Sequence, residues 1–268
     1  MIVAVAPSGA RHTRAQHPGL PLTAREIARE AAACRERGAV MLHLHVRDGA
    51  GRHSLDPEPY EDAIAAIRRE AGPELIVQIT TEAVGRFTPR EQMGSVRALR
   101  PDAVSVAIRE LIPDGSAEAS AAAFLAECGA RGLLLQYILY APAEVARLRE
   151  LVRRGVVPDA GASVLFVLGR RDRPGRAADL DPFTDAHDRS TPWFLCAFGA
   201  HEHACAMAAA ARGGHARVGF ENNFALADGA VAPDNAALVA QLTAAMPAAG
   251  RRPATHGEAL ALLGTRAP

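Results

Sequence analysis

Short apolar runs alternate with longer amphipathic segments along most of the chain. The runs are rich in Val, Ile, Leu and Ala, which is typical of buried strands, and they cover residues 2–6, 39–48, 75–79, 103–106, 133–139, 164–168, 193–198 and 216–219. The intervening segments predict helices over about residues 23–37, 56–71, 89–99, 116–130, 142–154, 179–189, 201–212 and 234–246. Thr23 and Glu26 have the spacing of a capping box at the start of the first helix.

Eight strands that alternate with helices predict an α/β fold, and specifically a single (β/α)8 TIM barrel formed by one domain over residues 1–268. An open, doubly wound sheet is the alternative. The segment after the first strand reads PSGARHT, which lacks the G-x-G-x-x-G fingerprint of dinucleotide-binding sheets. No internal repeat, low-complexity linker or block of like charge divides the chain. The pattern therefore favours the barrel.

The most informative run reads AVMLHLHVRD and places His43 and His45 inside an otherwise apolar strand. Side chains alternate between the two faces of a strand, so both imidazoles point to the same side. Two imidazoles on one face of a rigid strand are a natural pair of metal ligands. The alternative is that each is a hydrogen-bonded core histidine. Because two histidines share the face, the pattern favours a metal site.

In a TIM barrel the active site lies at the C-terminal ends of the strands. The polar residues expected there are Ser8, His43, His45, Thr80, Thr81, Glu82, Ser105, Arg217 and Glu221. Glu221 follows the eighth strand and would complete a set of two His and one carboxylate, which leaves one position on a metal open. The alternative for Glu221 is a carboxylate that satisfies the first turn of the next helix. Arg217 is costly to bury without an anion, which is either a substrate carboxylate or Glu221.

The remaining histidines carry weaker signals. His201 and His203 form a second H-x-H pair, but at the start of a helix residues two apart do not face the same way, so we expect both on the surface. No pairing that favours a metal is visible for the others, which are His12, His17, His53, His187, His215 and His256.

Composition narrows the possible functions. The formal net charge of the 268 residues is zero, which gives no electrostatic footprint for nucleic acid or membrane. Every basic residue other than His is Arg, so lysine Schiff-base chemistry is excluded. The four cysteines show no C-x-x-C spacing; they are Cys34, Cys128, Cys196 and Cys205. No secretory segment or run of transmembrane length is visible, so a cytoplasmic protein is expected.

Three segments, HLHVRD, QITTEAVG and GGHARVGFENN, together resemble the β-keto acid cleavage enzyme family, which includes 3-keto-5-aminohexanoate cleavage enzymes. The resemblance covers nearly the whole chain. It implies an oligomeric, zinc-bearing (β/α)8 barrel that condenses a β-keto acid with acetyl-CoA and cleaves a C–C bond in a retro-Claisen exchange, giving acetoacetate and a new acyl-CoA. It also implies roles for particular residues: zinc ligation by His43, His45 and Glu221, assistance of the base by Arg217, and keto acid contacts by Thr80, Thr81 and Ser105. Ser8, at the end of the first strand, is a further candidate substrate contact.

Two departures from the family pattern affect the expected reaction. The residue after the glutamate ligand is typically an Asp general base, but here it is Asn222, whose neutral amide cannot accept a proton at pH 7. Glu82 is the first candidate for a replacement base and Glu110 the second, although both also fit solvated loop charges. Members that act on aminated substrates carry an acid near the position of Tyr140 and Ala141, so an amino-substituted keto acid is disfavoured.

The arginine-rich segment GRRDRPGR, over residues 169–176, is either a solvated loop or a contact for the phosphates of CoA. Three other functions stay open. A metal-dependent hydrolase of the H-x-H type needs further histidines on later strands, and none is visible. A metal-dependent aldolase or lyase that does not use CoA needs the same enolate chemistry. A non-catalytic metal-binding barrel would follow if Asn222 marks the loss of the base.

Overall fold

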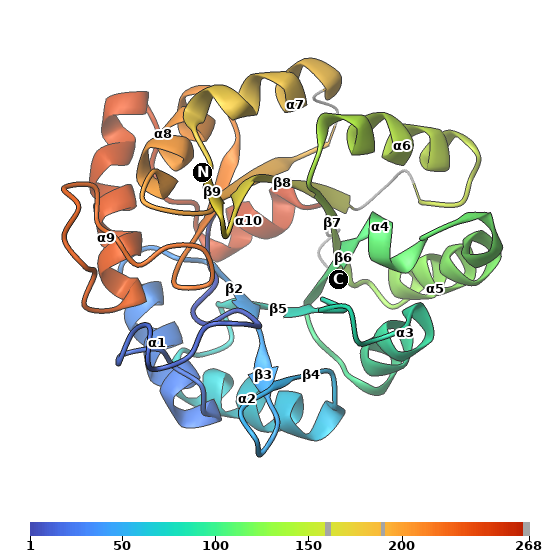
Figure 1. Ribbon diagram of the computed structural model, residues 1–268, viewed down its shortest axis with the longest axis horizontal. Helices are drawn as coiled ribbons and strands as arrows, with labels where there is room; N and C mark the ends of the chain where they lie inside the picture. Colours follow the sequence, from blue (N-terminus) through green and yellow to red (C-terminus); the bar gives the residue numbers. More distant parts are fainter. Residues whose placement is uncertain (159–161, 189–190, 265–268) are drawn as a thin grey trace.

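Eight parallel strands form a closed barrel in this computed structural model, which describes residues 1–158, 162–188 and 191–264. The strands are β1 (Val3–Val5), β2 (Met41–Leu44), β5 (Ile76–Thr80), β6 (Ala103–Ala107), β7 (Leu134–Leu139), β8 (Ala162–Arg170), β10 (Trp193–Ala197) and β11 (His215–Val218). The ring closes because β10 pairs with both β8 and β11, and β11 pairs with β1. Figure 1 shows most of the helices as a ring outside these strands. The predicted (β/α)8 barrel is therefore confirmed.

The helices follow the strands in the expected alternation. They are α1 (Ala24–Glu36), α2 (Pro57–Glu70), α3 (Pro89–Ala98), α4 (Ile108–Leu111), α5 (Glu118–Ala130), α6 (Pro142–Arg153), α7 (Asp181–Ala186), α8 (Glu202–Ala211), α9 (Asn235–Ala245) and α10 (His256–Leu262), with 3-10 turns η1 (Gly115–Ala117), η2 (Ala177–Leu180) and η3 (Met246–Ala249). The predicted capping box is present, because the Thr23 side chain accepts from the Glu26 N–H and the Glu26 side chain accepts from the Thr23 N–H. Within the described residues no helix is both long and apolar enough to cross a bilayer.

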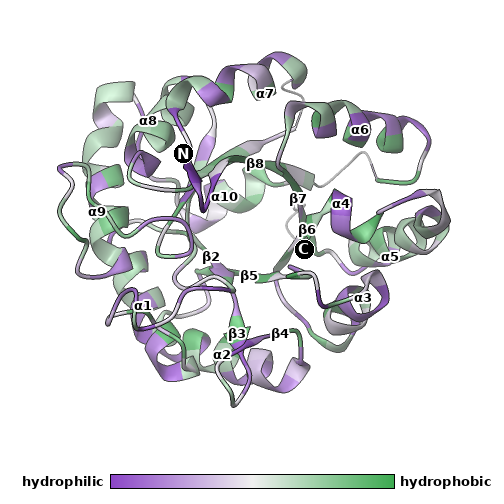
Figure 2. Cartoon of the chain, in the orientation of Figure 1, coloured by the Kyte–Doolittle hydropathy of each residue, from purple (hydrophilic) through white to green (hydrophobic). Residues whose placement is uncertain are grey.

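The apolar core has two layers because strand side chains alternate between the helices and the barrel interior. Leu42 belongs to the cluster that packs against the helices, whereas Met41 belongs to the cluster that fills the barrel. Ala254 donates its backbone N–H to Met1 O at 2.9 Å, and Leu263 joins the inner cluster, so the C-terminal segment with α10 closes the N-terminal end of the barrel. Figure 2 shows the barrel strands as largely hydrophobic, with hydrophilic residues mainly on the helices and loops around them. The opposite end of the barrel carries the candidate site.

The histidine strand is shorter than the predicted run over residues 39–48. Its ladder with β5 ends at Leu44, and after His45 the chain leaves the barrel to form a small antiparallel hairpin of β3 (Val46–Arg47) and β4 (His53–Ser54). The hairpin turns tightly because the Asp48 carboxylate accepts from the N–H groups of Ala50 and Arg52. This turn was not predicted, and it returns the chain past the end of the barrel.

Two further elements differ from the sequence prediction. The segment expected to be an arginine-rich loop is partly ordered as a hairpin, since β8 extends to Arg170 and pairs with β9 (Arg173–Pro174). The helix predicted over residues 179–189 instead begins as the 3-10 turn η2, and α7 ends at Ala186 because His187 is extended. Its predicted end, residue 189, lies outside the described residues.

Candidate metal centre and active site

The two imidazoles of the H-x-H pair meet inside the barrel. Leu42 and Leu44 face the helices, so the alternation of β2 directs His43 and His45 inward. Their Nε2 atoms lie 3.1 Å apart, and both side chains are almost fully buried. The expectation that they share one face is met, although His45 itself lies just beyond the strand.

Glu221 reaches the histidines from a tight turn after β11. Its Oε2 lies 3.3 Å from His45 Nε2 and 3.6 Å from His43 Nε2. The turn is fixed by its backbone, because Glu221 N donates to Ala6 O at 3.0 Å and Gly219 has a φ of +136°. A side chain at Gly219 would meet Ala6 O at 2.5 Å, so only glycine fits there.

Two buried side chains hold this turn from below. Glu202 on α8 accepts from Gly219 N at 3.1 Å, and Asn235 at the start of α9 accepts from Phe220 N at 2.7 Å. Burial raises the pKa of the Glu202 carboxyl well above its usual value. These two contacts tie the turn that carries Glu221 to α8 and α9.

Arg217 supplies the positive charge that the buried Glu221 carboxylate needs. Its Nη2 donates to Glu221 Oε1 at 2.9 Å, and its side chain is only 4% exposed. Burial by itself would raise the pKa of Glu221, but Arg217 and the two histidines outweigh it and hold that pKa well below its usual value. The Nε and Nη1 groups of Arg217 have no partner among the described residues. The predicted pairing with Glu221 is therefore present, and half of the guanidinium is left for another anion.

The donor set fits a divalent metal ion. His43, His45 and Glu221 offer ligand atoms within 4.8 Å of one another, and they are the only such group among the described residues. Ligands about 2.0–2.1 Å from one tetrahedral ion lie roughly 3.3 Å apart, close to the 3.1, 3.3 and 3.6 Å observed. Glu221 Oε2 is buried without a hydrogen-bond donor in the described structure, which a cation would satisfy. Two imidazoles and one carboxylate leave an open coordination position.

A cavity of about 480 Å³ lies over this group at the C-terminal end of the barrel. Loop residues form its rim, and apolar residues from β7, β8 and the segment after β10 form one wall; the latter are Ile138, Val167 and Phe198. Two ion pairs line the cavity besides Arg217–Glu221: Arg11 with Glu82, and Arg170 with Asp172 at 2.7 Å.

The structure separates the predicted substrate contacts into two groups. Thr80 and Glu82 line the cavity. Ser8, Thr81 and Ser105 are buried at the same end of the barrel but are not part of the lining. Thr81 Oγ1 donates to Ser105 O at 2.9 Å and so ties β5 to β6.

Among the acid–base residues, Glu82 and not Glu110 faces the cavity. The Glu110 carboxylate accepts from Ala83 N at 2.9 Å and from Gln92 Nε2, and burial raises its pKa. Asn222 is 5% exposed, lies outside the cavity lining, and neither atom of its amide has a partner in the described structure.

Three residues near the site were not found by sequence reasoning. His53 has no paired histidine nearby in the sequence, but the hairpin brings its ring centroid 5.2 Å from that of His45, and its Nε2 bonds to Glu82 O at 2.9 Å. His12 lines the cavity. Gln78 on β5 bonds to His43 Nδ1 at 2.8 Å. The turn signal at Asp48–Gly51 was the one local cue to the hairpin, whereas His12 and Gln78 had none.

Both residues of the second H-x-H pair are expected on the surface, but only His201 is fully exposed. His201 is exposed and His203 is half-buried at the start of α8, and neither belongs to the metal-capable group.

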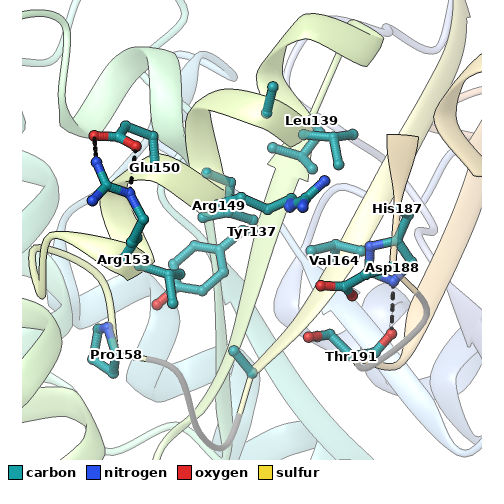
Figure 3. A pocket seen from close by; sticks show the side chains of 15 residues that line it. Tyr137, Leu139, Arg149, Glu150, Arg153, Pro158, Val164, His187, Asp188 and Thr191 are labelled. Atoms are coloured by element: carbon teal, nitrogen blue, oxygen red, sulfur yellow. Dashed lines mark hydrogen bonds and ion pairs between the residues drawn. The ribbon is translucent and has the colours of Figure 1, made fainter. Parts of the chain in front are cut away.

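A second cavity of similar volume, about 490 Å³, lies outside the barrel wall between α6 and the strands β7 and β8 (Figure 3). Several of its polar groups are hydrogen-bonded, since Arg153 bonds to Glu150, Arg149 Nη1 donates to Ala186 O at 3.3 Å, and His187 Nε2 bonds to Thr191 O. It has no cluster of metal-capable ligands within the described part of the chain. Of the two cavities, the one above His43 and His45 is therefore the one that contains the metal-capable group.

The fold and the site together define a (β/α)8 barrel with a His–His–Glu centre at the C-terminal end of its strands. The chain belongs to the β-keto acid cleavage enzyme family, whose model matches residues 1–265. It is 29% identical to a 3-oxoadipate:acetyl-CoA acetyltransferase from Cupriavidus necator, over 98% of this chain and 94% of that protein. It is 28% identical to a 3-keto-5-aminohexanoate cleavage enzyme from Fusobacterium nucleatum, over 98% of this chain and 97% of that protein.

Solved structures agree on the fold. A complex of ObcA with a C4-CoA adduct and oxalate superposes with a TM-score of 0.72 at 14% identity, covering 92% of this chain and 68% of that one. The apo structure of ObcA gives a TM-score of 0.70 and is covered to 65% of its length. At this identity the likeness concerns the barrel alone.

Proposed function

We propose that this protein is a zinc-dependent enzyme that cleaves a β-keto acid with acetyl-CoA as its co-substrate. The observation that carries the proposal is the convergence of His43, His45 and Glu221 beside a half-paired Arg217 in a chain of this family. Two imidazoles and a carboxylate are a ligand set typical of catalytic zinc. The relatives named for transfer to acetyl-CoA support the use of that co-substrate.

The proposed reaction exchanges acyl groups without an oxidant or water. A proton leaves C2 of the keto acid, and C2 forms a bond to the acetyl carbonyl carbon as the CoA thiolate leaves. The thiolate then attacks the original 3-oxo carbon, the C2–C3 bond breaks, and C2 regains a proton. The products are acetoacetate and the new acyl-CoA. Bound Zn²⁺ would supply Lewis-acid stabilisation of negative charge on the substrate oxygens.

Arg217 is proposed to bind the anionic end of the substrate. Its Nε and Nη1 are buried and have no partner in the described structure, and the residue lines the cavity. Each of these two groups has a free N–H that can donate to an oxygen of a carboxylate. Its third nitrogen stays bonded to Glu221, so the same side chain would orient both the metal ligand and the substrate.

Glu82 is proposed as the proton acceptor at C2. It is a carboxyl group in the cavity lining, and its partner Arg11 comes from the loop after β1. Asn222 follows the glutamate ligand but can neither accept nor return a proton. We assign Asn222 a role as an uncharged residue that does not transfer protons. Its amide has no partner in the described structure and lies in the turn that carries Glu221.

The charge pattern of the cavity favours a keto acid without an ammonium group. Each acidic residue in the described lining is already paired with an arginine: Glu82 with Arg11, Asp172 with Arg170, and Glu221 with Arg217. Beyond these pairs, Arg171 on the rim has no hydrogen bond or ion pair in the described structure. The hairpin over residues 170–174 is therefore proposed to contact the phosphates of CoA.

Metal analysis and acyl exchange on one sample test the proposal. Purified protein is expected to hold about one zinc per chain and to convert acetyl-CoA and a panel of β-keto acids, including 3-oxoadipate, to acetoacetate and new acyl-CoA. His43→Ala should lose both zinc and exchange, whereas the surface variant His201→Ala should keep both. Metal-free His43→Ala protein that remains active would refute the site.

One observation favours a second candidate function. The usual base is replaced by Asn222, so the chain is alternatively a non-catalytic metal-binding barrel. Zinc binding without turnover of any keto acid would establish this alternative, and turnover of the keto acid in the absence of CoA would identify a metal-dependent lyase.

A further inference from the structure

A chain of hydrogen bonds crosses the barrel interior from the metal centre to the far wall. His43 Nδ1 bonds to Gln78 Oε1 at 2.8 Å, Gln78 Nε2 donates to Gln136 Oε1 at 3.3 Å, and Gln136 Nε2 donates to Ser163 Oγ at 3.2 Å. All four side chains are buried, with 2% exposure or less. Apart from His43, none of them lines the cavity, so they do not contact a substrate there.

The chain is built from inward-facing positions of neighbouring strands. Gln78 is in register with His43 across β2 and β5, and Gln136 is in register with Ser163 across β7 and β8. Between them, β6 presents the small residue Ala103 in register with Gln78. Burying two side-chain amides in a barrel interior costs folding free energy unless every polar atom has a hydrogen-bond partner. This cost implies that the chain of hydrogen bonds serves a purpose besides packing.

The direction of this chain decides which nitrogen of His43 carries its proton. When Gln78 accepts through Oε1, the proton sits on Nδ1, and Nε2 turns a lone pair toward His45 and Glu221. If both amides rotated, Gln78 would donate to Nδ1, and the proton would move to Nε2, where it blocks a metal. Ser163 can both donate and accept, so it terminates the chain in either direction.

We infer that Gln78, which bonds to His43 through Oε1 and donates to Gln136 through Nε2, is a positioning residue that holds His43 as the Nδ1–H tautomer and so presents Nε2 to the metal. This inference rests on the proposed metal centre. The two histidines are not equivalent in this respect, because His45 Nδ1 is buried and has no partner among the described residues. Of the two histidine ligands, only His43 therefore has its ring oriented by a hydrogen bond at Nδ1, and Gln78 supplies that bond.

Two substitutions at Gln78 separate this role from simple packing. Gln78→Leu removes the acceptor and should weaken zinc binding about 10- to 100-fold, which is typical when the hydrogen-bond partner of a histidine ligand is lost. Gln78→Glu keeps an acceptor for Nδ1–H, and Gln136 can rotate to donate to the new carboxylate while accepting from Ser163. This variant should bind zinc at least as tightly as the natural protein.

Gln92→Leu is the matched control. Gln92 is as buried as Gln78, and its replacement by leucine also removes hydrogen bonds, to Thr81 O and to Glu110. However, Gln92 lies on α3, away from His43. It should lower the stability of the fold without changing zinc affinity.

Two readouts test the inference. Competition with a chromophoric chelator gives the zinc affinity, and long-range ¹H–¹⁵N correlation in chelator-treated protein gives the tautomer of His43. Natural protein should show His43 protonated at Nδ1, and Gln78→Leu should show a mixture. Zinc affinity of Gln78→Leu within twofold of the natural protein, or Gln78→Glu binding as weakly as Gln78→Leu, would overturn the inference. If the natural protein bound no zinc, the metal centre itself would fail, and a His43 proton on Nε2 would overturn the role of Gln78 independently.

Discussion

Gly9 packs directly against the ligand Glu221, and a single methyl group there should separate metal binding from folding. Gly9 has a φ of +63°, and a Cβ built on it would lie 2.6 Å from Glu221 Cγ and 3.0 Å from Glu221 Cβ. Carbon atoms in contact normally lie about 3.5–4.0 Å apart, so one side must move by roughly 0.9 Å. The Gly9 backbone is held in place, because Arg47 Nη2 donates to Gly9 O at 2.7 Å and to His12 O at 3.1 Å. We expect Glu221 to give way.

Metal sites tolerate ligand displacements of only about 0.2 Å, so Gly9→Ala should weaken zinc binding at least about 10-fold. It should also lose about 1–2 kcal/mol of unfolding free energy, because alanine is strained at positive φ. Gly250→Ala is the control for that strain: its φ is +66°, and a Cβ there meets nothing within 4 Å. Gly250→Ala should lose a similar amount of stability and keep its zinc affinity.

Chelator competition gives the zinc affinity, and urea unfolding in the presence of EDTA gives the stability of the metal-free protein. Gly9→Ala should differ from Gly250→Ala mainly in the first measurement. Zinc binding by Gly9→Ala within twofold of the natural protein would refute the argument, since it would show that Glu221 is not held against Gly9 or is not a ligand.

Three further outcomes are expected. Glu82→Gln should reduce kcat for acyl exchange about 10²- to 10⁴-fold without loss of zinc. Glu110→Gln should retain activity because Glu110 is not in the cavity lining. Equal effects of the two substitutions would contradict the choice of Glu82 as the base. Arg217→Lys keeps the charge but loses the N–H donors of the guanidinium. Steady-state kinetics should therefore show kcat/KM for the keto acid falling by roughly 10-fold or more, while KM for acetyl-CoA changes little. An unchanged kcat/KM would exclude Arg217 from substrate binding. Burial lowers the pKa of His215 to about 3 from 6.5, so the folded protein binds fewer protons than the unfolded chain between these values, and the unfolding free energy should fall by about 1.4 kcal/mol per pH unit for this group as the pH drops below 6.5. Urea unfolding of the natural protein and His215→Asn between pH 4.5 and 6.5 should show a shallower pH dependence in the variant, and identical slopes would disprove the assignment.

The sequence by itself determined the features that depend on neighbouring residues. Alternation of apolar runs with amphipathic segments predicted the (β/α)8 barrel, because both periodicities follow from local backbone geometry. The side-chain period of two placed His43 and His45 on one face. Thr23 and Glu26 form the predicted capping box for the same reason, since the contact spans one helical turn.

Only the tertiary structure decided which distant residues complete the site. Closure of the barrel pairs β11 with β1 and β1 with β2, and this pairing brings Glu221 to the histidines with a geometry that spacing along the chain does not specify. The pairing of β2 with β5 places Gln78 beside His43, and Glu82, which follows β5, lies in the cavity lining. Glu110 is also a glutamate, but the hydrogen bonds from Ala83 and Gln92 hold it outside the lining.

The hairpin after His45 shows why the sequence could not supply these contacts. His53 appeared unpaired because its partner is brought close by a turn and not by a strand period. Local patterns fix the direction of each side chain relative to its own element. The register and closure of the barrel, which depend on packing of the whole chain, fix which side chains meet.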